Sequence, residues 1–285
     1  MTGVMTYAGE RPGPPLDLFV DDVYVLSGAP GARRRLNVPP MPSAHLLVNL
    51  GDPVVLRDSD AAAPPLVLEG AWATGLWTRR FTIEYGSGVR VAGVHFKPWG
   101  LAPFAPLPPG ELRDRWVPAD AVWGPAIDRL RDDLAAAASA EAMPRLLAAW
   151  LRSRLGPPSS RGLELVHRTA ADLERSWGSA SVAHLADRAG VSGNRLAATY
   201  AAQVGVGPKR LARIYRFAHL MLSIDATRPV RWADLAREVG YFDQPHLIND
   251  FRGFTGLTPS DYLALRRRMP REAGFPLDLG PMPVE

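Results

Sequence analysis

Two short clusters of amide and basic side chains have the chemistry needed to read the edges of DNA bases. Asn194 and Arg195 form one cluster, and Gln244, His246 and Asn249 form the other. An Asn or Gln amide can pair through two hydrogen bonds with adenine, and an Arg guanidinium can do so with guanine. Such pairing needs a rigid element that carries the side chain into the major groove. The residues around each cluster therefore decide whether this chemistry is available.

The two clusters occupy equivalent places in an internal repeat. Segments 181–208 and 231–259 share their apolar, glycine and cap positions. The offset between them is 50 residues at first and becomes 51 from Ser192 and Asp243 onward, because the second copy gains one residue after Gly240. A repeat of this period indicates two copies of one supersecondary unit.

Each copy has the pattern of a helix–turn–helix. A short helix with apolar periodicity ends at a glycine, which takes positive φ without steric cost. Ser192 or Asp243 then caps a second helix through its side-chain oxygen. The apolar i, i+4 pairs of the second helices are Leu196 with Tyr200 and Leu247 with Phe251. Two such copies favour the DNA-reading motif, with recognition helices near 192–204 and 243–254, over a helical hairpin used only for packing.

A longer helix is predicted between the two copies, over residues 208–223. Its apolar residues follow the 3.6-residue period, and Lys209, Arg213 and Arg216 lie on its other face. At 1.5 Å per residue this helix spans about 24 Å. It can hold two recognition helices about 34 Å apart, the spacing of successive major grooves on one side of B-DNA. We expect one chain to read two adjacent groove segments.

The sequence of both copies resembles a known kind of domain. The second copy contains Gly240-Tyr241-Phe242-Asp243-Gln244-Pro245-His246-Leu247, Asp250-Phe251 and Gly256-Leu257-Thr258-Pro259-Ser260-Asp261-Tyr262. The first copy contains Leu185-Ala186, Ser192, Leu196, Val206 and Pro208 at matching places. Through these residues, 163–268 resembles the DNA-binding domain of AraC/XylS-type bacterial transcription regulators. The resemblance implies double-stranded DNA as a partner and makes RNA polymerase a further candidate partner.

Base reading is expected from the exposed, early positions of each recognition helix. The expected base-reading residues are Asn194, Arg195, Ala197, Ala198, Gln244, Pro245, His246, Ile248 and Asn249. Ala197 and Ala198 depart from the family, which usually has longer polar or basic side chains there, so we expect most base information from the second helix. For Gln244 and His246, a cap network at the helix start is the alternative.

Phosphate contacts are expected from side chains near the helix starts and from backbone amides. The side chains are Ser192, Arg210, Arg213 and Arg252. Arg266-Arg267-Arg268 ends the last predicted helix, where either a DNA contact or favourable charge at a helix C-terminus accounts for the three arginines.

Residues 1–155 follow a different pattern, in which short β-rich segments alternate with turns rich in Gly, Pro and Asp. The expected strands are Leu16–Leu26, His45–Leu50, Val54–Arg57, Leu66–Glu69, Arg80–Tyr85 and Arg90–Phe96, and the expected helices are Pro125–Ala137 and Ala140–Leu155. The predicted fold is α+β with two domains. A small antiparallel β barrel or sandwich with trailing helices precedes an all-α domain with two helix–turn–helix motifs joined by a linker helix.

We place an N-terminal effector-binding or dimerisation-like domain at 1–155 and a linker at 156–161, where Gly156-Pro157-Pro158-Ser159-Ser160 is rich in turn formers. An AraC-type DNA-binding domain is expected at 162–270 and a C-terminal tail at 271–285.

Two N-terminal segments, Val94–Gly100 and Trp123-Gly124, resemble the sensor-like β domain of a subset of these regulators. The resemblance implies sensing of a small molecule, dimerisation, or both. Because a pocket needs aromatic walls and a few polar groups, the candidate ligand residues are Trp72, Trp77, Arg79, Arg80 and His95. Core tryptophans with solvated arginines are the alternative. The helix at 140–155 is a candidate homodimer interface, with packing on its own domain as the alternative, and Arg33-Arg34-Arg35 is expected in an exposed loop.

Composition narrows the classes of function. The chain has no Cys, which excludes disulfides, thiolate metal sites and Cys nucleophiles. It shows no metal, phosphate-loop or nucleophile-elbow motif, so we expect no cofactor, no metal and no catalytic residues. No apolar run is long enough to span a bilayer and no signal peptide is evident, so a cytoplasmic protein without membrane contact is expected. Residues 178–270 hold 13 Lys and Arg against 7 Asp and Glu, the footprint of a DNA-binding module.

The leading hypothesis is a ligand-responsive, sequence-specific DNA-binding transcription regulator. The main alternative is a constitutively dimeric regulator whose N-terminal domain binds no ligand. An enzyme with an appended helical domain is the least favoured, because the sequence offers no catalytic constellation.

Overall fold

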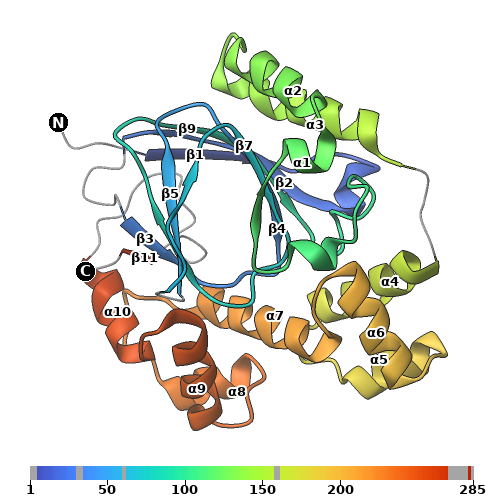
Figure 1. Ribbon diagram of the computed structural model, residues 1–285. Coiled ribbons are helices and arrows are strands. Elements are labelled where there is room, and N and C mark those ends of the chain that lie inside the picture. Colours follow the sequence, from blue (N-terminus) through green and yellow to red (C-terminus); the bar gives the residue numbers. More distant parts are fainter. Residues whose placement is uncertain (1–4, 30–34, 60–61, 157–160, 269–281, 284–285) are drawn as a thin grey trace.

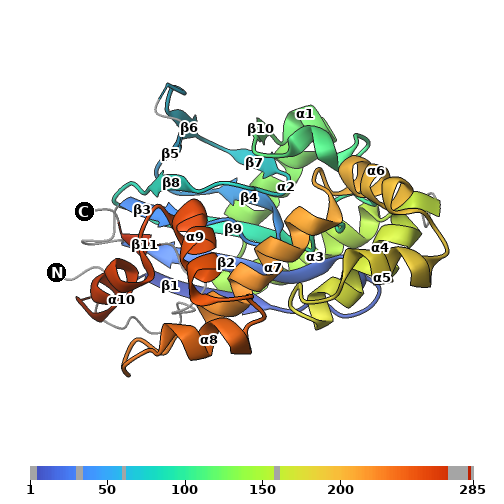
Figure 2. The same cartoon turned by 90° about the horizontal axis from the view of Figure 1, so that it is seen from below.

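The computed structural model describes residues 5–29, 35–59, 62–156, 161–268 and 282–283. The first half of the chain is a β domain that carries helices on one side, and the second half is helical (Figure 1). Helix α7 (Pro208–Ser223) runs along the β domain and joins two groups of helices at its ends (Figures 1 and 2). Arg33, Arg34, the linker residues 157–160 and most of the predicted tail lie outside the described residues.

The β domain consists of two antiparallel sheets. In spatial order, the larger sheet contains β1 (Met5–Glu10), β2 (Val20–Gly28), β9 (Val89–Phe96), β4 (Ala44–Asn49), β7 (Ala71–Thr74) and β10 (Trp116–Pro118). The smaller sheet contains β11 (Met282–Pro283), β3 (Arg35–Val38), β8 (Phe81–Glu84), β5 (Val54–Asp58) and β6 (Leu66–Leu68). The strands of the described residues form two open sheets. The prediction of an antiparallel β domain is therefore confirmed. Of its two predicted forms, the sandwich is correct and the closed barrel is wrong.

Alternation along the strands of the larger sheet divides its side chains between two cores. Leu47 and Val91 face the smaller sheet, whereas Leu46 and Val94 face the trailing helices. Those helices are α1 (Asp120–Trp123), α2 (Ala126–Ala135) and α3 (Met143–Arg154), and the short 3-10 turns are η1 (Leu16–Leu18), η2 (Pro109–Leu112) and η3 (Ala140–Ala142). Helix α3 packs across β2 and β9.

The helical half begins with α4 (Arg161–Arg175). The remaining helices are α5 (Val182–Ala189), α6 (Gly193–Gln203), α7, α8 (Trp232–Glu238), α9 (Gln244–Thr255) and α10 (Pro259–Arg268). One hydrophobic core runs through all of them, and the buried face of α7 lies at its centre. Leu76 and Trp99 of the β domain belong to this same core, each 1% exposed. The two domains are therefore packed against each other through apolar side chains as well as polar contacts.

The predicted helices agree with the structure more closely than the predicted strands. The linker helix and both recognition helices lie within a residue or two of their expected places. The prediction of strand from Leu16 is wrong at its start, because Leu16–Leu18 forms a 3-10 turn. Strands β1, β3, β7 and β10 have three to six residues each and were not predicted, since such short runs show little alternation. Arg35, expected in a loop, begins β3.

Candidate nucleic-acid interface

The first helix–turn–helix unit consists of α5, a tight turn and α6. Helix α5 ends at Gly190, whose φ of 67° lies in the left-handed region that glycine adopts readily. The Ser192 hydroxyl then accepts a hydrogen bond from the Arg195 amide at 3.2 Å and caps α6. Leu196 and Tyr200 are fully buried on one face of α6. The turn, cap and core pair predicted from the sequence are all present.

The second unit repeats this design in α8, the following turn and α9. Gly240 has a φ of 83°, and Asp243 Oδ1 accepts from the His246 amide at 2.8 Å. Leu247 and Phe251 are fully buried, and the Phe251 ring meets those of Phe217 and Tyr262 edge-on. Both recognition helices are thus fixed by a side-chain cap at one end and by an apolar pair along the buried face.

The residues expected to read bases lie at the start of α6 and α9 on their outward faces. Those that are exposed are Asn194, Arg195, Ala197, Ala198, Pro245 and Asn249, and those that are half-buried are Gln244, His246 and Ile248. The His246 ring lies edge-on to Tyr241, and its Nε2 is 3.9 Å from Asp250. This placement suits the alternative of a network at the helix start. Base contact by these nine residues stays a prediction.

Arg213, one of the expected phosphate contacts, ties the linker helix to the second recognition helix. Its Nη2 donates to Asp250 Oδ1 at 2.6 Å, and the Asp250 side chain is only 5% exposed. An acid on the apolar face of a helix requires such a partner. The need for a partner could have been predicted from the sequence, because Asp250 lies three residues after Leu247 on the buried side of α9.

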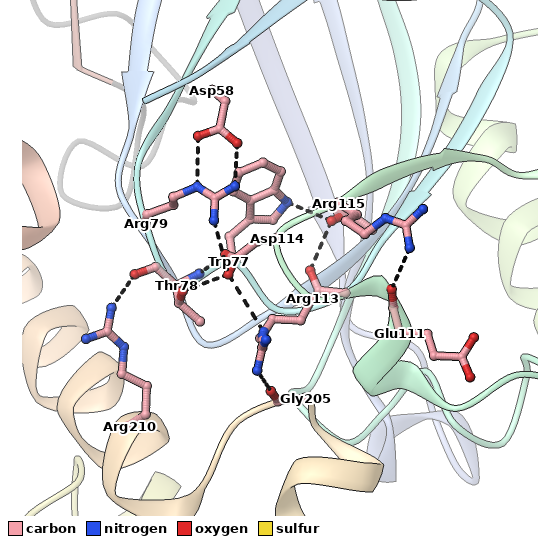
Figure 3. Close-up of polar contacts among 12 residues, drawn as sticks. Asp58, Trp77, Thr78, Arg79, Glu111, Arg113, Asp114, Arg115, Gly205 and Arg210 are labelled. Carbon is pink, nitrogen blue, oxygen red and sulfur yellow. Dashed lines mark hydrogen bonds and ion pairs between the residues drawn. The ribbon is translucent and has the colours of Figure 1, made fainter. Parts of the chain in front are cut away.

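Arg210 and Arg113 join the two domains near the start of α7 (Figure 3). Arg210, also an expected phosphate contact, donates from Nη2 to the Thr78 carbonyl at 2.5 Å. Arg113 donates from Nη1 to the Gly205 carbonyl at 2.8 Å, just beyond the end of α6. Of the other two expected phosphate contacts, Ser192 caps α6 and Arg252 is exposed on α9. Phosphate binding by these residues stays a prediction.

Asp114 holds the loop that presents Thr78 to the helical domain (Figure 3). Its two carboxylate oxygens accept from the Thr78 amide at 2.6 Å and from the Thr78 hydroxyl at 2.8 Å. Asp114 itself has a φ of 54°, which is uncommon for a residue other than glycine. Arg79 Nη1 lies 3.6 Å from the same carboxylate, and Arg79 Nε and Nη2 donate to the two carboxylate oxygens of Asp58 at 2.8 Å and 2.5 Å. The loop is therefore held by charge-assisted hydrogen bonds on both sides.

The C-terminal ends of both recognition helices rest on the β domain. At α6, the backbone of Gly110 approaches the helix so closely that a Cβ atom there would come within 2.6 Å of the Ala201 carbonyl oxygen. At α9, Asn37 Nδ2 donates to the Thr255 carbonyl at 3.0 Å, and a Cβ atom on Gly256 would lie 2.8 Å from Arg80 Cζ. At the N-terminal ends of α6 and α9, by contrast, the side chains of Asn194, Arg195 and Asn249 are exposed among the described residues.

The five candidate ligand residues each have partners within the protein, and the Arg79 guanidinium lies over the Trp77 ring. Trp77 is buried and donates to the Thr74 hydroxyl, and Trp72 donates to the Glu69 carbonyl. Arg79 is paired with Asp58, Arg80 lies against α9, and His95 bonds Asp22. A ligand site built from these five residues stays a prediction.

A polar cluster between the two sheets was missed at the sequence level, apart from His95. His95 is the register partner of Asp22 on β2 and of His45 on β4. Asp22 accepts from the Tyr7 hydroxyl at 2.8 Å and bonds His95 Nδ1 at 2.7 Å. The Tyr24 ring stacks on the His95 ring. Strand register alone brings these groups together, so spacing along the chain gave no sign of them.

The cluster changes the ionisation of its members. Burial opposes the charge on Asp22, but the hydrogen bond and the charge of His95 outweigh it and lower the pKa of this carboxyl. Burial, together with the neighbouring His95, lowers the pKa of His45 to about 3, so its imidazole is neutral near neutral pH. Burial also raises the pKa of Tyr7. An ionised carboxylate inside a β sandwich is the kind of group that concentrates at binding sites.

A cleft of about 380 Å³ lies elsewhere, between α4 and α5, and its lining includes His167, Arg168, Asp172 and Arg188. Asp172 pairs with Arg188 at 3.4 Å and with Arg175. Across the described ranges, no group of His, Cys, Asp or Glu is arranged to hold a metal ion. In the same part of the chain, no helix is long and apolar enough to cross a membrane.

The arginines at the end of α10 have neighbours within the helical domain. Arg267 donates from its guanidinium to the carbonyls of Ala226 and Arg228, both at 2.9 Å. The Arg266 guanidinium lies over the Tyr262 ring. Arg267 therefore holds the end of α10 to the segment before α8, and a DNA contact and favourable charge at the helix end both stay predictions for this run of arginines.

Comparison with protein families and curated proteins gives matches in both halves. A family described as a helix–turn–helix domain matches residues 185–265, and a domain of unknown function matches residues 10–118. An AraC-like transcription regulator of Streptomyces lividans is 34% identical over 125 residues, and one of Streptomyces antibioticus is 32% identical over 123 residues. Each match covers 43% of this chain and 38% of the relative.

Solved structures similar to the whole chain are distant in sequence. ToxT from Vibrio cholerae gives a TM-score of 0.44 at 10% identity, covering 93% of this chain and 98% of that one. ToxT bound to an unsaturated fatty acid gives 0.46 at 9% identity, with 92% and 94% covered.

Proposed function

We propose that the chain is a sequence-specific DNA-binding transcription regulator of the AraC type, because its C-terminal half matches a helix–turn–helix family and AraC-like regulators. In this proposal α6 and α9 enter two adjacent major-groove segments of one DNA duplex, and the chain has no catalytic role of its own.

The observation that carries the proposal is the pair of capped recognition helices on one linker helix. Each carries exposed side chains on its early, outward face, which is the end that enters the groove in helix–turn–helix proteins. Both are rooted in one hydrophobic core through α7, so their separation is set before DNA is met. A preformed pair of this kind binds without the entropic cost of ordering the two units.

Selection of binding sites from a pool of random double-stranded DNA by the full-length protein tests the proposal. We expect an enriched bipartite motif whose halves lie about 10 base pairs apart, one turn of B-DNA. We also expect the half read by α9 to carry more base information. If no motif is enriched, and the affinity for DNA varies with salt concentration but not with DNA sequence, the proposal is contradicted.

We further infer that the β domain senses a small molecule. The cluster around Asp22 and His95 supports this, because a half-buried carboxylate with a lowered pKa, set beside histidines between two sheets, is typical of a binding site. The contacts of Arg113, Arg210 and Asn37 with the helical domain give a route by which a change in the β domain reaches α6, α7 and α9. A ligand can shift this docking only by its difference in affinity for the two states.

Thermal-shift screening of the full-length protein against a metabolite collection tests the sensing role, with Asp22→Asn and His95→Gln as variants. We expect at least one compound to raise the Tm of the native protein and to lose this effect in the variants. If no compound raises the Tm and light scattering finds a dimer at every concentration, the constitutive dimer is correct instead.

We propose RNA polymerase as the partner that converts DNA binding into a change in transcription. In vitro transcription from a promoter that carries the selected site gives the sign of the effect. An increase identifies an activator and a decrease identifies a repressor. An unchanged transcript level at full occupancy of the site would contradict this part of the proposal.

A further inference from the structure

The turn of the second helix–turn–helix unit is one residue longer than that of the first, and the added residue is Phe242. Backbone hydrogen bonds establish the correspondence. The Val191 amide donates to the Ala186 carbonyl at 3.1 Å, and the Tyr241 amide donates to the Ala236 carbonyl at 2.8 Å. Val191 and Tyr241 therefore close equivalent turns. In the first unit the N-cap Ser192 follows at once, whereas in the second unit Phe242 stands between the closed turn and the N-cap.

Phe242 takes no part in the core that its neighbours build. Tyr241 is 4% exposed and packs in the hydrophobic core, as Val191 does in part in the first unit. A hydrophobic residue just before a helix cap often packs against the fourth helical residue, which here is Leu247. Phe242 is 89% exposed and makes no such contact. Within the described ranges it is the most exposed large hydrophobic side chain.

The position of Phe242 places it beside the proposed reading surface. It directly precedes Asp243, whose carboxylate caps α9, and Pro245 and Asn249 are exposed just beyond. The N-terminal end of a recognition helix is the part that meets base edges. An aromatic ring there lies against the groove and is large enough to make apolar contact with a base at its edge.

We propose that Phe242 is a further specificity-determining residue, which contacts the 5-methyl group of a thymine at the edge of the second half-site. The contact is one that apolar side chains make in the major groove. It accounts for a phenyl ring that is solvated in the free protein, because DNA covers it. This inference rests on the proposed function and adds one read position that the first unit, with its shorter turn, lacks.

The test measures the affinity of the full-length protein for its selected site. Each thymine is replaced in turn by deoxyuridine, which lacks only the methyl group. For the native protein we expect one position in the half read by α9 to lose about fourfold in affinity, as the burial of one methyl group predicts. Phe242→Ala should lose about tenfold on the native site, because a phenyl ring loses more buried apolar area than one methyl group, and should no longer respond to that replacement. Phe242→Leu should keep part of the response.

Val67→Ala is the matched control, because Val67 is 49% exposed on β6 in the other domain. It should bind as the native protein does, and the Tm of all variants should stay unchanged, since Phe242 is solvated. An equal loss on unrelated DNA would show a contact with the sugar–phosphate backbone and overturn the proposal. Native DNA affinity combined with lost transcriptional activity would show a protein partner at Phe242, and would also overturn it.

Failure of this inference is distinguishable from failure of the proposed function. If the native protein selects a site and Asn249→Ala weakens it while Phe242→Ala does not, only the role of Phe242 is wrong. If the native protein selects no site, the proposed function fails first.

Discussion

The two helix–turn–helix units share a scaffold but are anchored by different chemistry. In the first unit, the Tyr200 hydroxyl is 2.9 Å from the Thr169 hydroxyl of α4, so a buried hydrogen bond ties α6 to the helix that precedes the unit. In the second unit the equivalent residue is Phe251, and the tie is the ion pair between Asp250 and Arg213 of the linker helix. The second recognition helix is thus fixed directly to the element that sets its distance from the first.

The units also differ in what they present to DNA. Residues 51 positions apart are equivalent, so Asn249 corresponds to Ala198. The second unit adds Phe242 through its longer turn. The unit with the firmer tie to α7 is therefore the one that presents more hydrogen-bonding and apolar groups. The repeated fold therefore fixes the positions of the side chains in both copies, whereas the residue types at those positions determine how much each copy contributes to sequence recognition.

The largest expected effect comes from breaking the tie of the second unit. Asp250→Ala leaves Arg213 without its carboxylate and should lower the free energy of unfolding by about 2–3 kcal/mol, less than for a fully buried pair because Arg213 is 38% exposed. Chemical denaturation measures this loss. Asp187→Ala, an exposed acid on α5, should change stability by less than about 0.5 kcal/mol. A similar loss in both variants would refute a special role for the ion pair.

Removing a base-reading side chain should have the next largest effect. Asn249→Ala should cost about 1–3 kcal/mol of binding on the selected site and nothing on unrelated DNA. Asn194→Ala in the first unit should cost less than about 1 kcal/mol, because its neighbours Ala197 and Ala198 add little to that half-site. Quantitative gel-shift titration at fixed salt concentration compares the two. Equal costs would mean that both units read sequence equally.

Removal of the tie of the first unit should have a smaller effect than removal of the ion pair. Tyr200→Phe deletes one buried hydroxyl and should lower the free energy of unfolding by about 1 kcal/mol. The loss is limited because the Thr169 hydroxyl keeps its hydrogen bond to the Leu165 carbonyl. Thermal unfolding followed by circular dichroism measures it, with Thr199→Ala as an exposed-side control on the same helix. A loss above that of Asp250→Ala would invert the ranking of the two ties.

The smallest expected effect concerns the contact of the first unit with the β domain. Arg113→Ala removes the hydrogen bond to the Gly205 carbonyl. We expect the free energy of unfolding to fall by only about 0.5–1 kcal/mol, because Arg113 is exposed. Hydrogen exchange at the end of α6 should speed up, while exchange along α9 should not change. Arg115→Ala, an exposed neighbour whose side chain lies within its own loop, is the control. Equal exchange along α6 in both variants would contradict the role of Arg113.

Much of the helical half was predictable because its signals are local. Glycine at a helix end, Ser192 or Asp243 as a cap and apolar residues four apart act within one or two turns of helix. The β domain was predicted only in outline. Its short strands β3, β7 and β10 are stabilised by their neighbours in the sheet, and cross-strand pairing leaves no fixed spacing in the chain.

The sequence by itself determined that two capped helices, a linker helix and an antiparallel β domain would form, because propensity, caps and periodicity belong to short segments. Only the tertiary structure decided the partners of Asp250, the grouping of Asp22 with His95 and the docking of Arg210 on Thr78, which lies 132 residues away in the chain. Such contacts depend on the register of strands and on how two cores meet at Leu76 and Trp99. Those are properties of the assembled molecule, because each is fixed by the packing of many residues together.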